Sequence, residues 1–287
     1  MIQKIGKLNG GAFIIMILLI GCAFSGYGRI GVIAFTLLKL YLPFIGIPLM
    51  CILMIWMIIR MIRRKTVTRQ LCGILICGMM SFMMLTNLGI IDMAYPAHTK
   101  AITSVTAEWP FKETTIVGWG GDTVADNYHA AYPNMRYAYD LVMEPYDMGS
   151  TQNADYGIWN QPIYSPVKGR VVAICNDEED MMPNLEDFKS QLGNYVFIEI
   201  EETGTYLVLA HMKQGSIQVQ AGDWIEAGTL LGRVGNSGTT SEPHLHIHHQ
   251  KQNPVETLTF AEGLPLYFKD INENATLVKG TVVTPIK

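Results

Sequence analysis

Histidines are concentrated in one short stretch of this chain. All seven lie at or beyond residue 98, and four of them fall within six positions: His244, His246, His248 and His249. Residues two apart in a β-strand point to the same face, so His244 and His246 would present two imidazoles side by side while Leu245 points into the core. Such a pair suits a metal ligand next to a catalytic group. A His-x-His pair is a weak motif by itself, so the surrounding pattern has to support it.

The surrounding motifs occur in a fixed order. They are Asn127-Tyr128-His129, Asn134-x-Arg136-Tyr137-Ala138-Tyr139-Asp140-Leu141, Gly193-Asn194-Tyr195-Val196, Ala210-His211-Met212, Gly235-Asn236-Ser237-Gly238 and Glu242-Pro243-His244-Leu245-His246. Over about residues 105–268 the sequence resembles the lysostaphin-type zinc endopeptidases, which cut peptidoglycan peptides. The first two motifs look like the form found in one branch of that family.

The resemblance implies five site residues. His129, Asp140 and His246 would be the zinc ligands, and three protein ligands with a fourth position left for water are typical of a catalytic zinc. His211 and His244 would be catalytic residues close to the metal. We expect one of them to help deprotonate the water at the zinc, and one or both to donate hydrogen bonds to the tetrahedral oxyanion. The sequence does not assign these two roles.

One position departs from the usual form of the family. The first histidine usually precedes the aspartate by four residues, and here Arg136 occupies that position. An arginine stays cationic and cannot bind zinc. His129 is the nearest histidine upstream, and Pro133 predicts a turn that brings it back toward Asp140. If His129 is not the ligand, His98 or His248 are the candidates.

If His129 is the ligand, the three histidines 98, 248 and 249 are left without a role at the metal. We then expect His248 to be peripheral, although it would share a strand face with His246 and family members often carry an acid there. His98 and His249 are interpreted as structural or surface residues.

The elements that must position these residues are mainly β-strands. From about Ile102 onward, short β-rich runs alternate with Gly, Pro, Asn and Asp, as in residues 167–175, 194–212 and 225–234. One short helix is expected within Met181–Gln191. The runs predict a mainly β domain over residues 96–287, and the resemblance implies an antiparallel β-sheet sandwich of the duplicated-hybrid-motif type.

The first part of the chain has a different composition. Three apolar runs, at about residues 10–25, 40–59 and 71–91, approach the roughly 20 residues that a bilayer-spanning helix needs. The loop at residues 60–70 carries five bases and no acid, which the positive-inside rule assigns to the cytoplasm. Residues 1–95 are therefore predicted to be a multi-pass anchor of three helices in the lipid bilayer of the cell membrane, with the β domain extracytoplasmic. Lipidation of Cys22 at the end of a signal sequence is an open alternative for the first run.

Charge and cysteine usage exclude several classes of function. Residues 101–287 contain 11 Lys and Arg against 24 Asp and Glu, which argues against nucleic acid as a partner. Cys175 is the only cysteine in that part, so no disulfide can form within it. No His-Glu-x-x-His or Gly-x-Ser-x-Gly motif of other hydrolases is present.

These features predict a zinc-dependent endopeptidase, a metalloprotease that hydrolyses peptide bonds in bacterial cell-wall peptidoglycan. A secreted polypeptide remains an alternative substrate. A non-catalytic domain of the same fold, which binds wall peptide or activates another hydrolase, is an alternative function. A phosphocarrier of the sugar-phosphotransferase type also uses two histidines, but it would have to face the cytoplasm.

Overall fold

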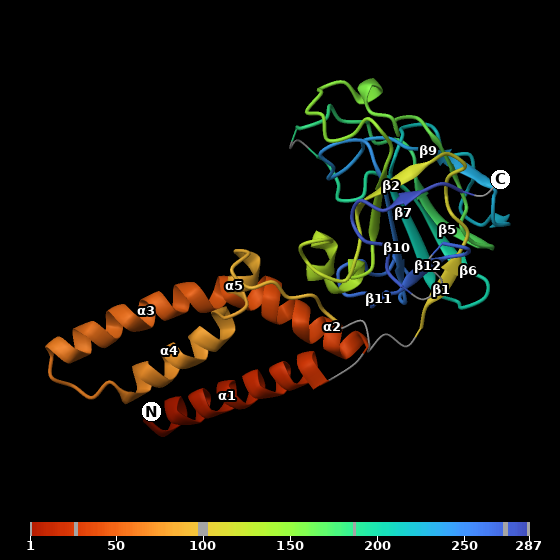
Figure 1. Cartoon of the computed structure of the whole chain (residues 1–287). Helices are drawn as coiled ribbons and strands as arrows, with labels where there is room; N and C mark the ends of the chain where they lie inside the picture. The colour runs from red at the N-terminus through yellow and green to blue at the C-terminus, as the bar shows by residue number, and fades with distance from the viewer. Residues whose placement is uncertain (1, 26–27, 97–102, 186–187, 272–274, 286–287) are drawn as a thin grey trace. The chain divides into compact units, whose positions relative to one another are not determined.

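The chain consists of two structural units. The computed structural model describes residues 2–25, 28–96, 103–185, 188–271 and 275–285 (Figure 1). Contacts divide the chain into a helical unit, Met1–Met93, and a β unit, Ala94–Lys287. Each unit is described by itself below.

The helical unit is built almost wholly from apolar segments. Its elements are α1 (Ile2–Ser25), α2 (Arg29–Thr36), the π-helical turn η1 (Leu37–Tyr41), α3 (Leu42–Ile62), α4 (Thr68–Ser81) and α5 (Met84–Asn87). Pro43 lies two residues after the π turn and has no N–H to donate, which accounts for a local change in the hydrogen-bonding pattern. Helices α3 and α4 pack side by side, and α1 contacts α2 and α4.

Two helical segments are long and apolar enough to cross a membrane. They are Arg29–Ile62, with 34 residues, and Thr68–Asn87, with 20 residues, while Gly10–Phe24 is a shorter apolar helix. The expected second segment, residues 40–59, therefore begins earlier, because the apolar run from Ile30 is helical as well. Among the described residues the third segment ends at Asn87 rather than at 91.

The β unit contains one large sheet and two small strand pairs. Its strands are β1 (Val105–Ala107), β2 (Thr115–Trp119), β3 (Tyr139–Val142), β4 (Pro162–Tyr164), β5 (Gly169–Cys175), β6 (Asn194–Ile200), β7 (Tyr206–Met212), β8 (Trp224–Ile225), β9 (Leu230–Arg233), β10 (Leu245–Gln250), β11 (Gly263–Leu264), β12 (Leu266–Phe268) and β13 (Val282–Val283). The large sheet has the order β13-β2-β3-β10-β7-β6-β5-β8, with β11 on β10, and all its pairs are antiparallel. Strands β4 and β9 form an antiparallel pair, and β1 and β12 a parallel one. The prediction of a mostly β domain is correct.

The two faces of the large sheet bury different sets of side chains. Leu207, Leu209, Leu245 and Ile247 belong to the main hydrophobic core on one face. A smaller cluster that includes Val208 and Ala210 lies on the other face. Alternation along β10 therefore sends its even-numbered residues, the histidines 246 and 248, to the face of the smaller cluster.

Short 3₁₀ helices interrupt the loops around the sheet. They are η3 (Tyr128–Ala131), η4 (Pro133–Met135) and η5 (Asn153–Asp155). The expected helix within Met181–Gln191 is absent from its described residues, which exclude 186 and 187.

Gly193 allows the loop before β6 to touch the loop before β10. Its φ is +61°, and a Cβ added there would lie 2.3 Å from the carbonyl carbon of Ser237. Gly204 has a similar φ of +64° but no atom within 4 Å of such a Cβ. Comparing substitutions at Gly193 and Gly204 therefore separates the energetic cost of a left-handed backbone from the cost of a steric clash.

We predict that Gly193→Ala lowers the free energy of unfolding by about 3 kcal/mol, because left-handed strain and a backbone clash add together. Gly204→Ala should cost only about 1 kcal/mol, from the backbone strain alone. Urea unfolding followed by tryptophan fluorescence measures both, since four of the five tryptophans lie in the β unit. Equal losses for the two variants would show that the contact with Ser237 does not limit this loop.

Candidate metal centre

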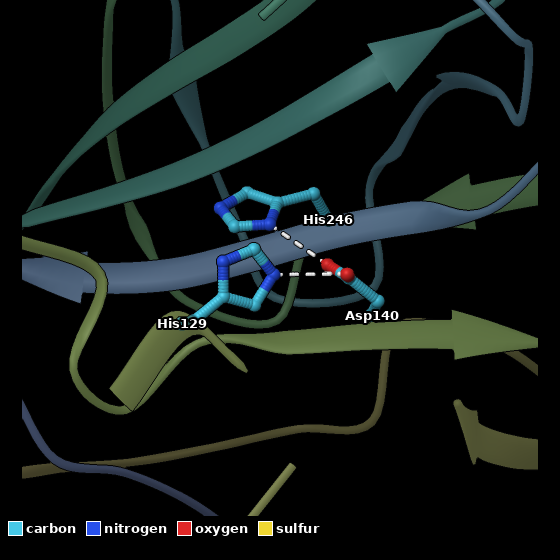
Figure 2. Close-up of side chains that lie close together, drawn as sticks. All are labelled: His129, Asp140 and His246. Carbon is cyan, nitrogen blue, oxygen red and sulfur yellow. Dashed lines mark hydrogen bonds and ion pairs between the residues drawn. The ribbon is translucent and has the colours of Figure 1, made fainter. Parts of the chain in front are cut away.

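Three buried side chains from separate segments of the β unit converge on one point. They are His129, Asp140 and His246, and their ligand atoms all lie within 4.8 Å of one another. His129 Nε2 is 2.9 Å from Asp140 Oδ2, and His246 Nδ1 is 2.8 Å from Asp140 Oδ1. Figure 2 shows both imidazoles directed at the carboxylate of Asp140. Two imidazoles and one carboxylate form a donor set that can hold a metal ion.

Two neighbouring strands position Asp140 and His246. The residues are direct cross-strand partners in the antiparallel pair of β3 and β10. On β3, the flanking Tyr139 and Leu141 point to the main core, so Asp140 points to the opposite face. On the other side of β10, His246 is paired with Ala210 of β7, whose small side chain leaves room for the imidazole ring.

A capped 3₁₀ helix positions His129. Asn127 accepts a hydrogen bond from the backbone N–H of His129 at 3.2 Å. The same side chain donates to the carbonyl of Ala138 at 3.0 Å, close to the start of β3. Asn127 thus ties the helix that carries His129 to the strand that carries Asp140, and the chain folds back through the turn at Pro133.

The Asp140 carboxylate is ionised although it is only 3% exposed. Burial alone would raise its pKa, but the neighbouring histidines, His129 foremost, outweigh burial and hold the pKa well below its usual range. Tyr128 also donates a hydrogen bond to Oδ2 at 3.2 Å. A buried carboxylate of this kind requires compensation by a positive group, and a metal ion held by these side chains would supply it.

His211 and His244 form a second pair next to this cluster, with ring centroids 4.7 Å apart. Each is oriented by a backbone carbonyl. His211 Nδ1 lies 2.8 Å from the carbonyl oxygen of Ser237, and His244 Nδ1 lies 2.8 Å from that of Glu242. A carbonyl can only accept, so in both rings Nδ1 carries a proton, and Nε2 is the nitrogen directed away from that carbonyl.

Both rings lie close to the cluster, and the ring centroid of His211 is 5.9 Å from that of His246. His244 Nε2 is 3.8 Å from Asp140 Oδ1, and it is buried without a hydrogen-bond partner among the described residues. Burial, reinforced by His244 and His246, lowers the pKa of His211 well below its usual range. His211 is therefore neutral at pH 7 and able to accept a proton.

An irregularity in β7 directs His211 toward the site. Simple alternation would place it on the face opposite Ala210, in the main core. Between Leu209 and Met212 the strand contains one more residue than its partner β6, and His211 has a φ of +61°. A bulge with one left-handed residue turns a side chain to the other face.

His248 lies in direct contact with the cluster, closer than the sequence analysis expected. Its side chain is 1% exposed, and its Nδ1 lies 2.8 Å from His246 Nε2. Burial, with His246 next, lowers the pKa of His248 well below its usual range, so the ring is neutral. The interpretation of His248 as peripheral is therefore wrong. The alternation of histidines along the strand was the signal that could have indicated this contact.

Tyr128, whose hydroxyl bonds to Asp140, appeared in the sequence analysis only as part of the Asn127-Tyr128-His129 motif. Its contact with the cluster is a second feature that the motif did not predict.

The two remaining histidines were interpreted as structural or surface residues. His249 is buried on the opposite face, where it bonds to Thr205 and to the carbonyl of Pro265, so it is structural and not a surface residue. His98 lies outside the described residues.

Arg136, which stands at the usual histidine position, points away from the cluster. Its Nη2 lies 3.5 Å from an oxygen of Asp122, and its Nε donates to the carbonyl of Pro96 at 2.9 Å. The guanidinium thus fastens the first residues of the β unit to the segment between His129 and Asp140. Its charge is thus paired with the carboxylate of Asp122.

A groove of about 920 Å³ runs past the cluster. Asp140, Tyr128 and His244 line it, and so do Trp119 and Lys279, whose Nζ lies 3.3 Å from the indole centroid. The volume is within the range of sites that take a ligand the size of a short peptide. The site thus combines a donor set that can hold a metal ion, two further histidines and space for a ligand.

A comparison with protein families finds one match. The model of peptidase family M23 matches residues 151–257. This range includes His211, His244 and His246, whereas His129 and Asp140 lie before it.

Similar solved structures include three peptidases. The catalytic domain of a point mutant of the prophage-encoded M23 protein EnpA from Enterococcus faecalis is 20% identical, with 45% of this chain and 73% of that chain covered and a TM-score of 0.31. Lysostaphin from Staphylococcus simulans is 20% identical, with coverage of 53% and 52% and a TM-score of 0.32. A zinc-containing peptidase from Vibrio cholerae is 17% identical, with coverage of 55% and 37% and a TM-score of 0.28.

No curated protein matches this chain significantly. The family match and the arrangement of the buried histidines address the same part of the β unit. Together they support a peptidase family M23 domain in the second unit of this chain.

Proposed function

We propose that this chain is a zinc-dependent endopeptidase that hydrolyses peptide bonds of bacterial cell-wall peptidoglycan. One observation carries the proposal. Two histidines, His211 and His244, are each held at Nδ1 by a backbone carbonyl beside the buried cluster of His129, Asp140 and His246. A metal ligand set combined with separate proton acceptors is what metal-assisted hydrolysis requires.

The donor set fits zinc. Zinc in catalytic sites is bound by three protein ligands drawn from His, Asp, Glu and Cys, with one position left open. His129 Nε2, Asp140 Oδ2 and His246 Nδ1 supply two nitrogens and one oxygen, and the buried negative charge of Asp140 favours a cation. When bound, zinc would polarise the scissile carbonyl and lower the pKa of the attacking water.

His211 and His244 would carry out the proton transfers of the reaction. In its neutral form, His244 or His211 accepts the proton of the attacking water at Nε2. Once protonated, the same nitrogen becomes a donor that can stabilise the oxyanion or protonate the leaving amine. Tyr128 holds Asp140 by its hydroxyl and lines the groove, where it can also contact the substrate backbone.

The helical unit is proposed to anchor this domain to the outer face of the cell membrane. Many of its large apolar side chains are exposed, among them Ile52, Ile55 and Trp56 of α3, which suits lipid rather than water as the surrounding medium. The bases of the loop between α3 and α4 support a cytoplasmic position for that loop. The β unit would then lie outside, next to the cell wall.

Membrane topology can be measured with reporter fusions. A reporter that is active only outside the cytoplasm should be active when fused after Lys100 and inactive when fused after Lys65. The reverse pattern would contradict both the topology and a peptidoglycan substrate, because the β unit would then face the cytoplasm.

Zinc content tests the assignment of ligands. We predict that His129→Ala abolishes stoichiometric zinc as completely as His246→Ala, because each removes one of only three protein ligands. Arg136→Ala is the matched control from the same segment and should retain about one zinc per chain. Elemental analysis of the purified chain measures this, and full zinc in His129→Ala would mean that the third ligand lies elsewhere.

Activity tests the roles of the second histidine pair. His211→Ala and His244→Ala should each lower hydrolysis of purified peptidoglycan by about 10²–10⁴-fold and leave the zinc content unchanged, because neither residue is a ligand. Mass analysis of the released peptides provides the measurement. Loss of zinc in His211→Ala would refute its role, and a zinc-loaded wild-type chain that releases no peptide would favour the non-catalytic alternative.

A further inference from the structure

A buried row of hydrogen bonds leads away from the cluster along one face of β10. His246 Nε2 lies 2.8 Å from His248 Nδ1, and His248 Nε2 lies 3.1 Å from Gln250 Oε1. None of the three side chains is more than 2% exposed. They share a face because they are spaced two residues apart in a strand.

The far end of the row determines its direction. Gln250 Nε2 donates to two backbone carbonyls, those of Gln252 at 2.7 Å and Thr257 at 3.3 Å. The amide is therefore oriented with its Oε1 toward His248. Because Oε1 can only accept, His248 Nε2 must carry the proton of that ring.

The same reasoning continues to the cluster. A neutral imidazole has one protonated and one bare nitrogen, so His248 Nδ1 is bare and accepts a hydrogen bond from His246 Nε2–H. His246 Nδ1 is then bare as well, and it lies 2.8 Å from Asp140 Oδ1. Two lone pairs facing each other at this distance repel unless a cation is shared between them.

The two histidines of the cluster differ in this respect. His129 Nδ1, its nitrogen away from Asp140, is buried and has no hydrogen-bond partner among the described residues. The outer nitrogen of His246 is held by His248. Of the two imidazoles, only that of His246 has its outer nitrogen held by a further side chain.

We propose that His248 and Gln250 are positioning residues, which keep the proton of His246 on Nε2 and thereby present Nδ1 as a bare, oriented metal ligand. The inference rests on the proposed zinc site and concerns the affinity of that site. Partners of this kind keep the ligand ring oriented and raise its basicity, and their loss typically weakens metal binding by about 10–100-fold.

Three substitutions on one strand separate this role from a general effect on folding. His248→Leu fills the space but breaks the row. His248→Gln can restore it, because an amide can accept from His246 and donate to Gln250. His249→Leu is the matched control, since His249 is equally buried but lies on the opposite face, bonded to Thr205 and to the carbonyl of Pro265.

Zinc affinity of the full chain in detergent, measured by competition with a chromogenic chelator, provides the test. We expect about 10–100-fold weaker zinc binding for His248→Leu and an affinity within about 3-fold of wild type for His248→Gln. His249→Leu should lower the unfolding temperature but leave zinc affinity unchanged. The absorption spectrum of the cobalt-substituted chain should change in His248→Leu and not in His249→Leu, because only the former alters the orientation of a ligand.

Several outcomes would overturn the inference. Wild-type zinc affinity in His248→Leu, or equal losses in His248→Leu and His249→Leu, would show that the row does not act on the metal. If His248→Leu does not fold, Gln250→Leu takes its place, with weaker zinc binding expected and unchanged binding as the contrary result. A wild-type chain that binds no zinc would refute the proposed function itself, which is a distinguishable failure.

Discussion

The ionised carboxylate of Asp140 is the constraint on which the candidate site depends. A charge this deeply buried is unfavourable unless several partners compensate for it. The chain supplies a hydroxyl from Tyr128 and an imidazole from His129, and a cation shared with His246 Nδ1 would complete the compensation. The capping side chain of Asn127 and the pairing of β3 with β10 serve to bring these groups to the carboxylate.

The histidines around Asp140 differ in role because they differ in hydrogen-bond partners. A backbone carbonyl at Nδ1 directs Nε2 of His211 and His244 away from it, which suits the proposed proton transfer. The imidazole of His248 at Nε2 leaves Nδ1 of His246 for the proposed metal ligand. One kind of side chain is thus suited to two kinds of chemistry, and the difference follows from which ring nitrogen has a hydrogen-bond partner.

The two units of the chain differ in where their apolar side chains lie. In the β unit, apolar residues are buried in the cores on the two faces of the sheet, and polar loops surround the groove. In the helical unit, apolar side chains remain exposed along α3 over several turns. Helices satisfy their own backbone hydrogen bonds, so this unit is suited to a lipid environment in which no water is available to do so.

The sequence by itself determined the mainly β character of the second unit, the apolar helices of the first and the choice of residues for the cluster. Tertiary structure alone decided the orientation of His211 and the environment of His248. The former follow from local patterns, namely alternation, apolar run length and ordered motifs. The sequence offered the approach of His129 to Asp140 only as a hypothesis. Whether the two side chains meet depends on the cap at Asn127, the turn at Pro133 and the register of two strands, which are set by long-range pairing. Alternation along β7 predicts the wrong face for His211, because one extra residue and a left-handed backbone conformation reverse its direction. Alternation places His248 on the strand face of His246, but the burial of His248 could not be predicted, because burial depends on what packs over the strand and not on the strand's own residues.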